Sequence, residues 1–408
     1  MSDWRHITLG DLAKSNGCTI QTGPFGSQLH KHEYQAEGIG VVNPTHMADR
    51  RVSHNSVPCV SPEVAKRLSK HQMLPGDLLF ARRGEIGRHA IITESERGWL
   101  CGTGCFLVRV DSPESDSTYV SFYLSTDESV EWLNRHAAGV VMANLSNNVL
   151  QRVPISLPPL PEQKKIAHIL STVQQAIEAQ ERIIQTTTEL KKALMYKLFT
   201  EGLRNEPQKQ TEIGPVPESW EVKTVGDICR SIVPGRNKPK VFDGDIPWLT
   251  IPNIKGLNYI NPDVDGLRVS SAELKSSGGR RIPERSVIMS CVGEFGVSAV
   301  TNIEIVINQQ LHAFVCPEHL NPAFLCNQLR YRKPYMDRIA AITTIPYLNK
   351  SKCESVPIAL PGRVEQDEIA AAFSTLDTKR DQHVAYRNTL RDLFRTLLHE
   401  LMTAKTRV

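Results

Sequence analysis

The chain has 408 residues, of which 40% are hydrophobic and 23% are charged. These are ordinary values for a globular protein, and they exclude wholesale disorder. A typical domain has roughly 150 residues, so the length predicts two or three domains rather than one. The 48 lysines and arginines against 44 aspartates and glutamates give a net charge of +4, which is too small to indicate a nucleic-acid partner by itself.

Neither targeting signals nor cysteines indicate a membrane protein, a secreted disulfide-rich protein or a zinc protein. The sequence has no apolar run long enough to span a membrane and no signal peptide at its start, so we expect a cytoplasmic protein without a membrane partner. The nine cysteines favour reduced thiols over a disulfide framework in such a location. Cys101 and Cys105 form a close pair, but no further ligands stand near them at zinc-site spacing, so we expect no bound metal.

Residues 1–155 mix short β-rich runs, such as GIGVV, DLLFA and CFLVRV, with helical segments such as Tyr119 to His136. LPGDLLFARRGEIG, which starts at Leu74, is typical of a strand, a tight glycine turn and a second strand. We therefore predict a mixed α/β domain over this part of the chain.

Residues 156–205 change to a helical pattern. They include LPPLPEQ, where proline can occupy the first helical turn and glutamate favours the helix N-terminus. Apolar residues then recur in steps of three and four from Ile166 to Leu198, the heptads of a coiled coil, with the polar Gln180 and Thr187 in mid-seam. About 40 residues at 1.5 Å of rise per residue would span on the order of 60 Å, so we expect a spacer helix.

Residues 206–218 are polar and contain prolines, as expected for a linker. Residues 219–358 again mix β-rich runs, such as PWLTI, SVIMS and HAFVC, with helices, and IPERSVIMSCVGEFG from Ile282 parallels the glycine hairpin of the first domain. These features predict a second α/β domain.

Residues 359–408 carry a second heptad pattern, which also has polar residues in mid-seam. Two long helices on one chain pack most simply as an antiparallel coiled coil, and a solvated single-helix spacer is the alternative. The polar seam positions are Arg380, His383 and Arg387.

The chain repeats itself. VPISLPPLPEQKKIA, from Val153, recurs 203 residues later as VPIALPGRVEQDEIA, from Val356, and WRHITLGDL, from Trp4, resembles WEVKTVGDI, from Trp220. A period of this length is too long for a solenoid and indicates a duplicated globular domain with an attached helix. We expect an internal pseudo-twofold repeat.

These residues resemble a known family, the specificity subunit of type I restriction-modification systems. The resemblance covers the whole chain and rests on the two-copy plan, on LSNNVLQRVPISLPPLPEQKKIAHIL with its echo LNKSKCESVPIALPGRVEQDEIAAAF, and on GPFGSQL from Gly23 to Leu29. The most specific element is Leu-Pro-x-x-x-Glu-Gln-x-x-Ile-Ala at the entry to each long helix. The second copy lacks the second proline and has IVPGRNKPK where the first has the GPFGS loop, which leaves the loop correspondences open.

The resemblance implies a subunit that does no chemistry itself. Each globular unit would be a target-recognition domain that reads one half of a split, asymmetric site in double-stranded DNA, while the helices set the gap. The implied partners are two modification subunits, docked on the helices, which methylate adenine with S-adenosylmethionine, and restriction subunits that translocate and cut DNA with ATP and magnesium. We therefore expect no cofactor on this chain.

A self-contained enzyme is the first alternative. Pro262, Asp263, Glu273 and Lys275 match a nuclease spacing, but VSSAELKSSGG around them is polar and glycine-rich, whereas the second acid of such a metal site needs a buried strand. The segment Asn43–His46 faintly resembles the catalytic loop of adenine methyltransferases but lacks its aromatic residue and a preceding glycine-rich cofactor loop. No phosphate-binding loop for ATP occurs.

Two further alternatives concern scaffolding and metals. A pure coiled-coil interaction scaffold would bind no DNA. Eight of the 13 histidines fall in residues 1–155, but His30 and His32 are better explained as part of a polar loop than as metal ligands.

Base reading requires arginine, lysine, asparagine or glutamine on exposed turns, since these side chains make the contacts that separate guanine from adenine. Candidates gather near the glycine hairpins of both domains, and phosphate contacts should outnumber base contacts among them. The candidate DNA-binding residues are Gln28, His30, Lys31, Arg50, Arg51, Arg82, Arg83 and Arg88 in the first domain, and Arg236, Asn237, Lys238, Lys240, Lys255, Arg280, Arg281, Gln309 and Gln310 in the second.

Overall fold

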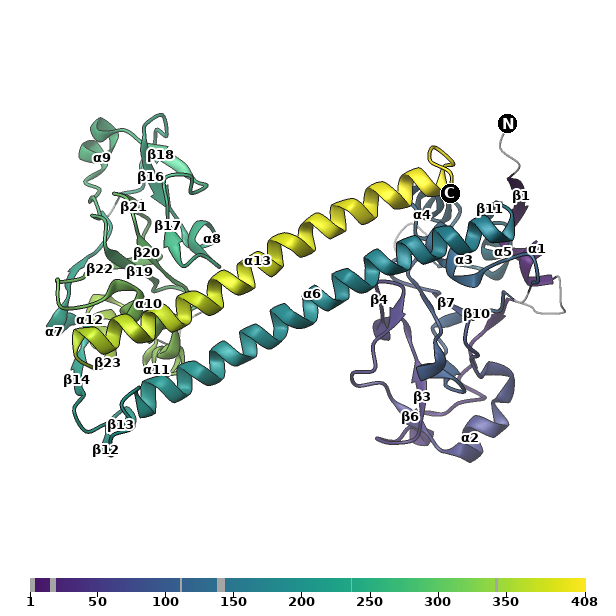
Figure 1. The fold of residues 1–408 in the computed structure, drawn as a ribbon, viewed down its shortest axis with the longest axis horizontal. Coiled ribbons are helices and arrows are strands. Elements are labelled where there is room, and N and C mark those ends of the chain that lie inside the picture. The colour runs from purple at the N-terminus through teal and green to yellow at the C-terminus, as the bar shows by residue number, and fades with distance from the viewer. Residues whose placement is uncertain (1–3, 15–19, 111, 138–143, 236, 342–343) are drawn as a thin grey trace. The chain divides into compact units, whose positions relative to one another are not determined.

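The computed structural model describes residues 4–14, 20–110, 112–137, 144–235, 237–341 and 344–408 (Figure 1). The chain divides into two compact units, Met1–Glu181 with Ala385–Val408, and Arg182–Val384. Each unit contains one globular α/β part, called domain 1 and domain 2 below, together with part of each of two long helices. No helix in the described part of the chain is apolar enough over its length to cross a membrane.

The elements follow one another in a similar order in both copies, although the second copy begins with an additional hairpin, residues 208–217, and has a helix and a strand, residues 251–260, where the first has two strands, residues 47–52. Those up to the end of the first long helix are β1 (Arg5–Thr8), α1 (Leu9–Lys14), β2 (Gln21–Thr22), β3 (Ile39–Val42), β4 (Met47–Ala48), β5 (Arg51–Val52), β6 (Cys59–Val60), α2 (Pro62–Arg67), β7 (Leu78–Ala81), β8 (His89–Ile91), β9 (Leu100–Cys101), β10 (Cys105–Val108), α3 (Ser117–Leu124), α4 (Asp127–His136), α5 (Asn147–Gln151), β11 (Pro154–Leu157) and α6 (Leu160–Glu201).

The second copy ends with the second long helix. Its elements are β12 (Gln208–Thr211), β13 (Gly214–Pro217), β14 (Glu221–Thr224), α7 (Val225–Ile228), β15 (Arg230–Ile232), β16 (Ile246–Leu249), α8 (Ile251–Ile254), β17 (Tyr259–Ile260), β18 (Leu267–Val269), α9 (Ser271–Ser277), β19 (Ser286–Ser290), β20 (Ser298–Thr301), β21 (Val306–Ile307), β22 (Leu311–Val315), α10 (Pro322–Tyr331), α11 (Lys333–Ile339), α12 (Lys350–Glu354), β23 (Pro357–Leu360) and α13 (Arg363–Met402).

The strand pairings of domain 1 recur in domain 2. The main sheet has the order β2-β10-β7-β8 in domain 1 and β15-β22-β19-β20-β17 in domain 2. A parallel pair, β3 with β9 or β16 with β21, lies beside it, and an antiparallel pair, β1 with β11 or β14 with β23, joins the start of each domain to its end. The predicted mixed α/β class and the internal repeat are confirmed.

Buried apolar side chains hold each domain to its helix. In domain 1, the fully buried Tyr119 and Phe122 of α3 belong to the same core cluster as Ile166 and Leu170 of α6. In the second unit, Phe199 of α6 packs edge-on against Phe324 of α10 in the corresponding core. Burying side chains of this size is worth roughly 2 kcal/mol each, so each helix end is part of a domain core.

The signature glutamine attaches α6 to domain 1. Gln163 is fully buried, its carbonyl oxygen accepts from the Asp116 N–H (2.8 Å), and its amide donates to the carbonyls of Glu114 (2.9 Å) and Pro158 (2.7 Å). The amide oxygen thereby accepts one hydrogen bond, and both amide protons are donated, all to or from backbone groups. This explains why the signature requires glutamine rather than another polar residue.

The same construction recurs at the start of α13. Gln366 accepts from the Asn321 N–H (2.8 Å) and donates to the carbonyls of His319 (3.3 Å) and Pro361 (2.9 Å). The neighbouring glutamate of the signature, Glu365, accepts from the Leu203 N–H (2.7 Å) at the end of α6.

Within each unit the two long helices are antiparallel. In the first unit Glu162 at the start of α6 pairs with Arg407 beyond the end of α13 (2.8 Å), whereas Glu181 pairs with Arg391 (2.6 Å). In the second unit the order is likewise reversed, with Lys191 paired to Asp377 and Arg204 to Glu368. The predicted pair of long antiparallel helices is confirmed.

Three details differ from the expectations. The heptad residue Leu190, which was expected to be buried in the seam, is 53% exposed. The segment Tyr119–His136 forms two helices, because Thr126 caps α4 by accepting from the Ser129 N–H and so starts a new helix. Residues 206–218 are not a plain linker but contain the antiparallel hairpin β12–β13, which buries Val216 in the second core.

Candidate nucleic-acid interface

Loops from different parts of domain 1 meet at one end of its main sheet. The Gly23 N–H donates to the Cys105 carbonyl (3.0 Å), and the Arg82 N–H donates to the Gly104 carbonyl (2.8 Å). The Leu145 N–H donates in turn to the Arg82 carbonyl (2.9 Å). We call these segments, residues 23–38, 82–88, 102–104 and 144–145, the loop end of domain 1.

Domain 2 has an equivalent arrangement. The Cys291 N–H donates to the Gln310 carbonyl, the Leu348 N–H to the Cys291 carbonyl, and the Gly293 N–H to the Pro346 carbonyl, each at 2.8 Å. We call residues 233–235, 237–245, 291–297, 308–310 and 344–347 the loop end of domain 2.

The two loop ends share backbone contacts but differ in side chains. Cys291 makes the two backbone hydrogen bonds that Arg82 makes in domain 1. The next residue is the exposed Arg83 in domain 1 and the half-buried Val292 in domain 2. One backbone framework therefore presents a basic turn in one domain and an apolar turn in the other.

Three predicted contacts lie in the long loop of domain 1. Gln28, His30 and Lys31 are all exposed. The Gln28 side chain accepts from the Phe25 N–H (3.1 Å), and the His30 ring stacks on His32 with 5.5 Å between the ring centroids. The loop is thus held by local contacts while its polar atoms face outward.

The glycine hairpin of domain 1 carries three more predicted contacts. Arg83 is exposed, whereas the Arg82 guanidinium lies 5.9 Å from the centre of the Phe106 ring. Arg88 pairs with Glu85 (2.5 Å) and also donates to the Pro44 carbonyl (3.3 Å). Arg83 is therefore the cation of this turn that is best placed to reach a ligand.

Arg50 and Arg51 lie on the turn between β4 and β5, which faces the helices. The Arg50 guanidinium stacks 3.4 Å from the centre of the Phe122 ring and donates to Ser121 Oγ (3.2 Å) and to the side chain of Gln174. Burial lowers its pKa to about 9, which leaves it charged at neutral pH. Arg51 pairs with Glu178 (2.7 Å), so this turn joins domain 1 to α6.

A cavity of about 620 Å³ opens beside this turn in the first unit. Its walls come from the β4–β5 turn, the glycine hairpin, α4, α6 and the last turns of α13. The wall side chains are mixed in charge and polarity, including Arg50, Glu178, Glu181, Arg391 and Phe394.

The first loop of domain 2 carries four of the predicted residues. Asn237 and Lys238 are exposed, and the Lys238 ammonium lies 5.5 Å from the centre of the Trp248 ring. The Lys240 N–H donates to Glu273 (2.6 Å), which fastens the loop to α9. The fourth residue, Arg236, lies outside the described residues.

The remaining predicted residues of domain 2 are exposed, and most of them form hydrogen bonds or ion pairs with other residues of the domain. The Gln309 side-chain amide donates to the Gly235 carbonyl (2.9 Å), and the Gln310 backbone N–H donates to the side-chain oxygen of Asn308 (3.1 Å). Lys255 pairs with Glu294 (2.7 Å), which brings it to the tip of the hairpin. Arg281 pairs with Glu304, and Arg280 is exposed.

Large exposed apolar residues at the loop ends are absent from the predicted set. Ile345 is 58% and Tyr347 is 42% exposed in domain 2, and Phe25 is 52% exposed in domain 1. A search for polar side chains on turns could not find them. The sequence did offer one signal for domain 2: Ile345 and Tyr347 lie on either side of a proline between two elements.

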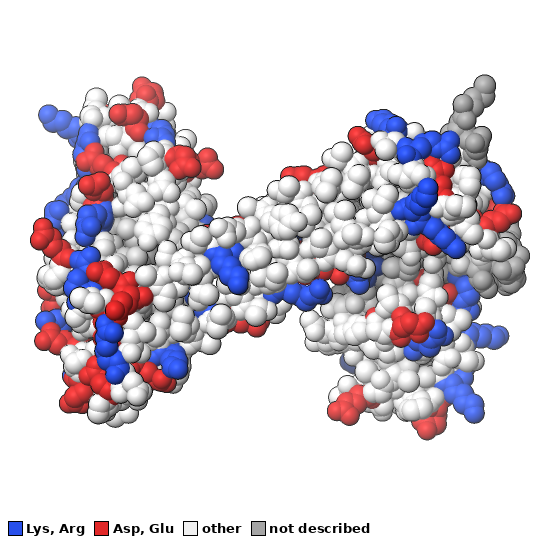
Figure 2. All heavy atoms as spheres, in the orientation of Figure 1, with Lys and Arg blue, Asp and Glu red and all other residues white. Residues whose placement is uncertain are grey.

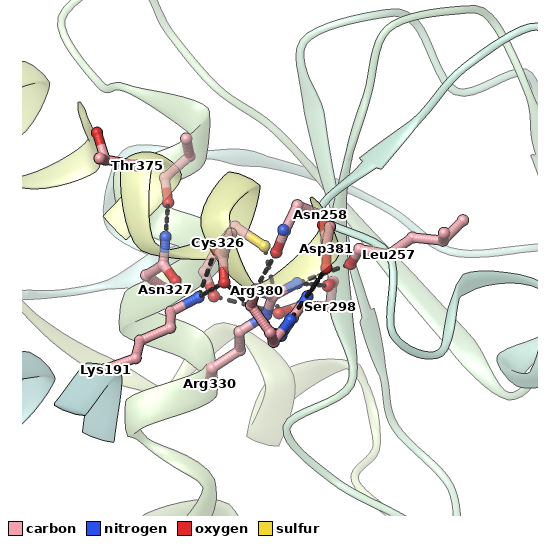
Figure 3. A network of polar contacts seen from close by, with 12 residues as sticks. Lys191, Leu257, Asn258, Ser298, Cys326, Asn327, Arg330, Thr375, Arg380 and Asp381 are labelled. Carbon is pink, nitrogen blue, oxygen red and sulfur yellow. Dashed lines mark hydrogen bonds and ion pairs between the residues drawn. The ribbon is translucent and has the colours of Figure 1, made fainter. Parts of the chain in front are cut away.

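A polar network joins domain 2 to both helices (Figure 3). Lys191 of α6 and Asp377 of α13 form a buried ion pair (2.6 Å), and burial lowers the pKa of Lys191 although the pairing opposes this shift. Nearby, Arg330 of α10 donates to Asn258 (2.6 Å) and to the Ser298 carbonyl (2.6 Å). These contacts position domain 2 on the helices.

The repeat-equivalent of Lys191 in the first unit is an apolar residue. Phe394 stands 203 residues after Lys191 in the sequence, and its ring lies 5.9 Å from that of Phe122 in domain 1. The two domain–helix junctions thus use different chemistry at the same place in the repeat.

The described residues contain no cluster of three or more potential metal ligands. Glu273, one acid of the nuclease pattern, lies on helix α9 instead of a buried strand. The segment Pro44–His46 forms a short 3₁₀ turn. Figure 2 shows basic and acidic side chains interspersed on the visible face, without one continuous basic field.

A family model for the type I restriction modification DNA specificity domain matches residues 1–188 and 217–388. The chain belongs to this family. It is 26% identical to the MjaVIII type I restriction enzyme specificity subunit of Methanocaldococcus jannaschii over 311 residues, which cover 72% of this chain and 71% of the relative. It is 19% identical to the HindI specificity subunit of Haemophilus influenzae over 435 residues, which cover 89% and 91%.

Solved structures of this family show the same fold. The S subunit of a type I restriction-modification system from M. genitalium aligns with a TM-score of 0.64 at 16% identity, covering 98% of this chain and 96% of that one. A chain from a structural study of type I complex assembly aligns with a TM-score of 0.53 at 18% identity, covering 98% and 97%. The two-copy specificity-domain architecture is therefore shared, and the family resemblance found in the sequence is confirmed.

Proposed function

We propose that this specificity subunit reads a split, asymmetric DNA site, one half with each loop end. The observation that carries the proposal is the pair of equivalent loop ends with unlike side chains, Arg82–Arg83 against Cys291–Val292. Two reading heads at a fixed separation select two half-sites at a fixed spacing. Because the heads differ, the two half-sites differ.

The subunit itself performs no chemistry in this proposal. Methylation with S-adenosylmethionine and ATP-driven translocation and cleavage belong to modification and restriction subunits, and this chain supplies the sequence. The membership of the chain in the specificity-domain family supports this division.

We further propose that one modification subunit docks on each long helix. Leu190 of α6 and Leu393 of α13 occupy equivalent positions in the repeat, and they are 53% and 45% exposed. Tyr196 and Tyr386 on the same two helices are 60% and 53% exposed. Contiguous apolar patches mark protein interfaces, and in this proposal these residues belong to such a patch on each helix. Two copies of one partner would explain why the repeat retains both leucines.

Co-expression tests the proposal. The chain is produced with its modification subunit in a cytoplasm free of adenine methylation, and methylated adenines are detected on genomic DNA with and without the chain. We expect methylation in one sequence context only when the chain is present. Methylation that persists in the same context without this chain would refute the proposal.

A further inference from the structure

The loop end of domain 2 displays an apolar side chain where a DNA-reading surface is expected to be polar. Ile345 is 58% exposed, and its neighbour Tyr347 is 42% exposed. A Cβ atom added at Gly293, on the tip of the hairpin, would lie 3.9 Å from an Ile345 methyl group. Ile345 therefore stands directly beside the hairpin tip.

The backbone around Ile345 is rigidly placed. Pro346 follows it, and the Pro346 carbonyl accepts from the Gly293 N–H (2.8 Å). Two residues further on, the Leu348 N–H donates to the Cys291 carbonyl (2.8 Å). Proline restricts the preceding residue to extended conformations, so the isoleucine has little backbone freedom to lose on binding.

The polar groups of the same loop end point to nucleic acid rather than to an apolar protein partner. Gln309, Gln310, Asn237 and Lys238 share the same loop end and are exposed. These amides and cations are the groups that contact base edges and phosphates. Glu294, the nearby acid on the hairpin, is paired with Lys255 (2.7 Å), so its charge is offset.

We infer that Ile345 contacts the 5-methyl group of a thymine in the half-site read by domain 2. The apolar group that base pairs present in the major groove is this methyl, and a fixed aliphatic side chain amid hydrogen-bonding groups selects for it. The inference rests on the proposed DNA-reading function.

The test begins with the methylated motif of the wild-type complex. Ile345→Ala should relax one thymine position in the domain 2 half-site and leave the other half unchanged, and Ile345→Val should restore most of the preference. Val364→Ala is the matched control, since Val364 is an aliphatic residue with 68% exposure on the first turn of α13. The control should leave the motif unchanged.

A second arm isolates the methyl group. Synthetic duplexes carry deoxyuridine in place of the thymine, which removes the methyl and preserves base pairing. With purified complex, the methylation rate at low duplex concentration should fall about fourfold for the wild type, as expected for loss of one buried methyl group. The Ile345→Ala complex should not distinguish the two duplexes.

The outcomes separate the inference from the function it rests on. A split motif that Ile345→Ala leaves unaltered, or a domain 2 half-site without thymine, would overturn the inference alone. Failure of the Ile345→Ala chain to co-purify with the modification subunit would also overturn it, by assigning the residue to a protein contact. Absence of any split motif with the wild-type chain would overturn the proposed function.

Discussion

Gln163 and Gln366 make equivalent sets of three backbone hydrogen bonds at the starts of the two long helices, 203 positions apart in the sequence. Each glutamine links the loop that precedes a helix of its domain, α3 or α10, to the proline-containing segment that precedes a long helix, α6 or α13. The relation shows that the signature shared by the two copies is an attachment point between domain and helix.

Truncating this glutamine should destabilise the first unit. Gln163→Ala leaves the Asp116 N–H and two carbonyls without their partner, and it removes a fully buried side chain. We expect a loss of about 2–4 kcal/mol in the free energy of unfolding, measured by urea denaturation. Gln185→Ala, at an exposed position of the same helix, should change it by under about 0.5 kcal/mol. Equal effects of the two variants would contradict the attachment role.

The buried Lys191–Asp377 pair should be sensitive to losing one partner and tolerant of losing both. Asp377→Asn leaves a buried ammonium without its counter-ion, which should cost about 3 kcal/mol. The double variant Lys191→Met with Asp377→Leu should recover most of this loss. Thermal unfolding of the single and double variants provides the measurement, and additive losses in the double variant would disprove the coupling.

Stability should fall with acidification because each domain buries a neutral histidine. Burial lowers the pKa of His89 and of His312 to about 4, below the ordinary value of about 6.5. The unfolded chain therefore binds more protons between these values, and the stabilisation present above pH 6.5 is lost as the pH falls towards 4, by on the order of 3 kcal/mol per histidine. In the His89→Gln variant the slope of unfolding free energy against pH should become shallower, and an unchanged slope would count against this assignment.

Loss of Arg83 should affect one half-site only. Arg83 is exposed on the hairpin of domain 1, and an arginine contact to a base discriminates by about 1–3 kcal/mol. Arg83→Ala should therefore relax the domain 1 half-site about tenfold or more at one position, as seen in the distribution of methylated sequences. Equal relaxation in both halves would contradict independent reading by the two domains.

The helices should act as a ruler. Inserting one heptad into each helix, near Gln180 and near His383, keeps the same helix faces in contact and lengthens each helix by about 10 Å. That length corresponds to about three base pairs, so the gap should grow by about this amount while both half-sites stay the same. An unchanged gap, or altered half-sites, would refute the ruler.

Local sequence patterns predicted the elements but not the environments made by distant residues. Gly84 and Gly293 indicated hairpins, and both are present with positive φ. Arg50 was predicted as a DNA contact, whereas its surroundings come from Phe122 and Gln174, far along the chain. The DNA roles of the predicted residues stay predictions.

Two other features could not be predicted from the sequence, for physical reasons. The heptad pattern predicted that Leu190 lies in the seam, whereas it is exposed. Periodicity alone cannot distinguish an apolar face that packs on the second helix from one that stays exposed. The hairpin in residues 206–218 was missed because its prolines and polar residues also fit a linker, and its stability comes from burial of Val216 against domain 2.

The most direct test of two-headed reading is the sequence of the methylated motif. Single-molecule sequencing of DNA from cells that contain this chain and its modification subunit should show two unlike half-sites separated by a fixed, unspecified gap. A continuous motif, or two identical half-sites, would contradict the account.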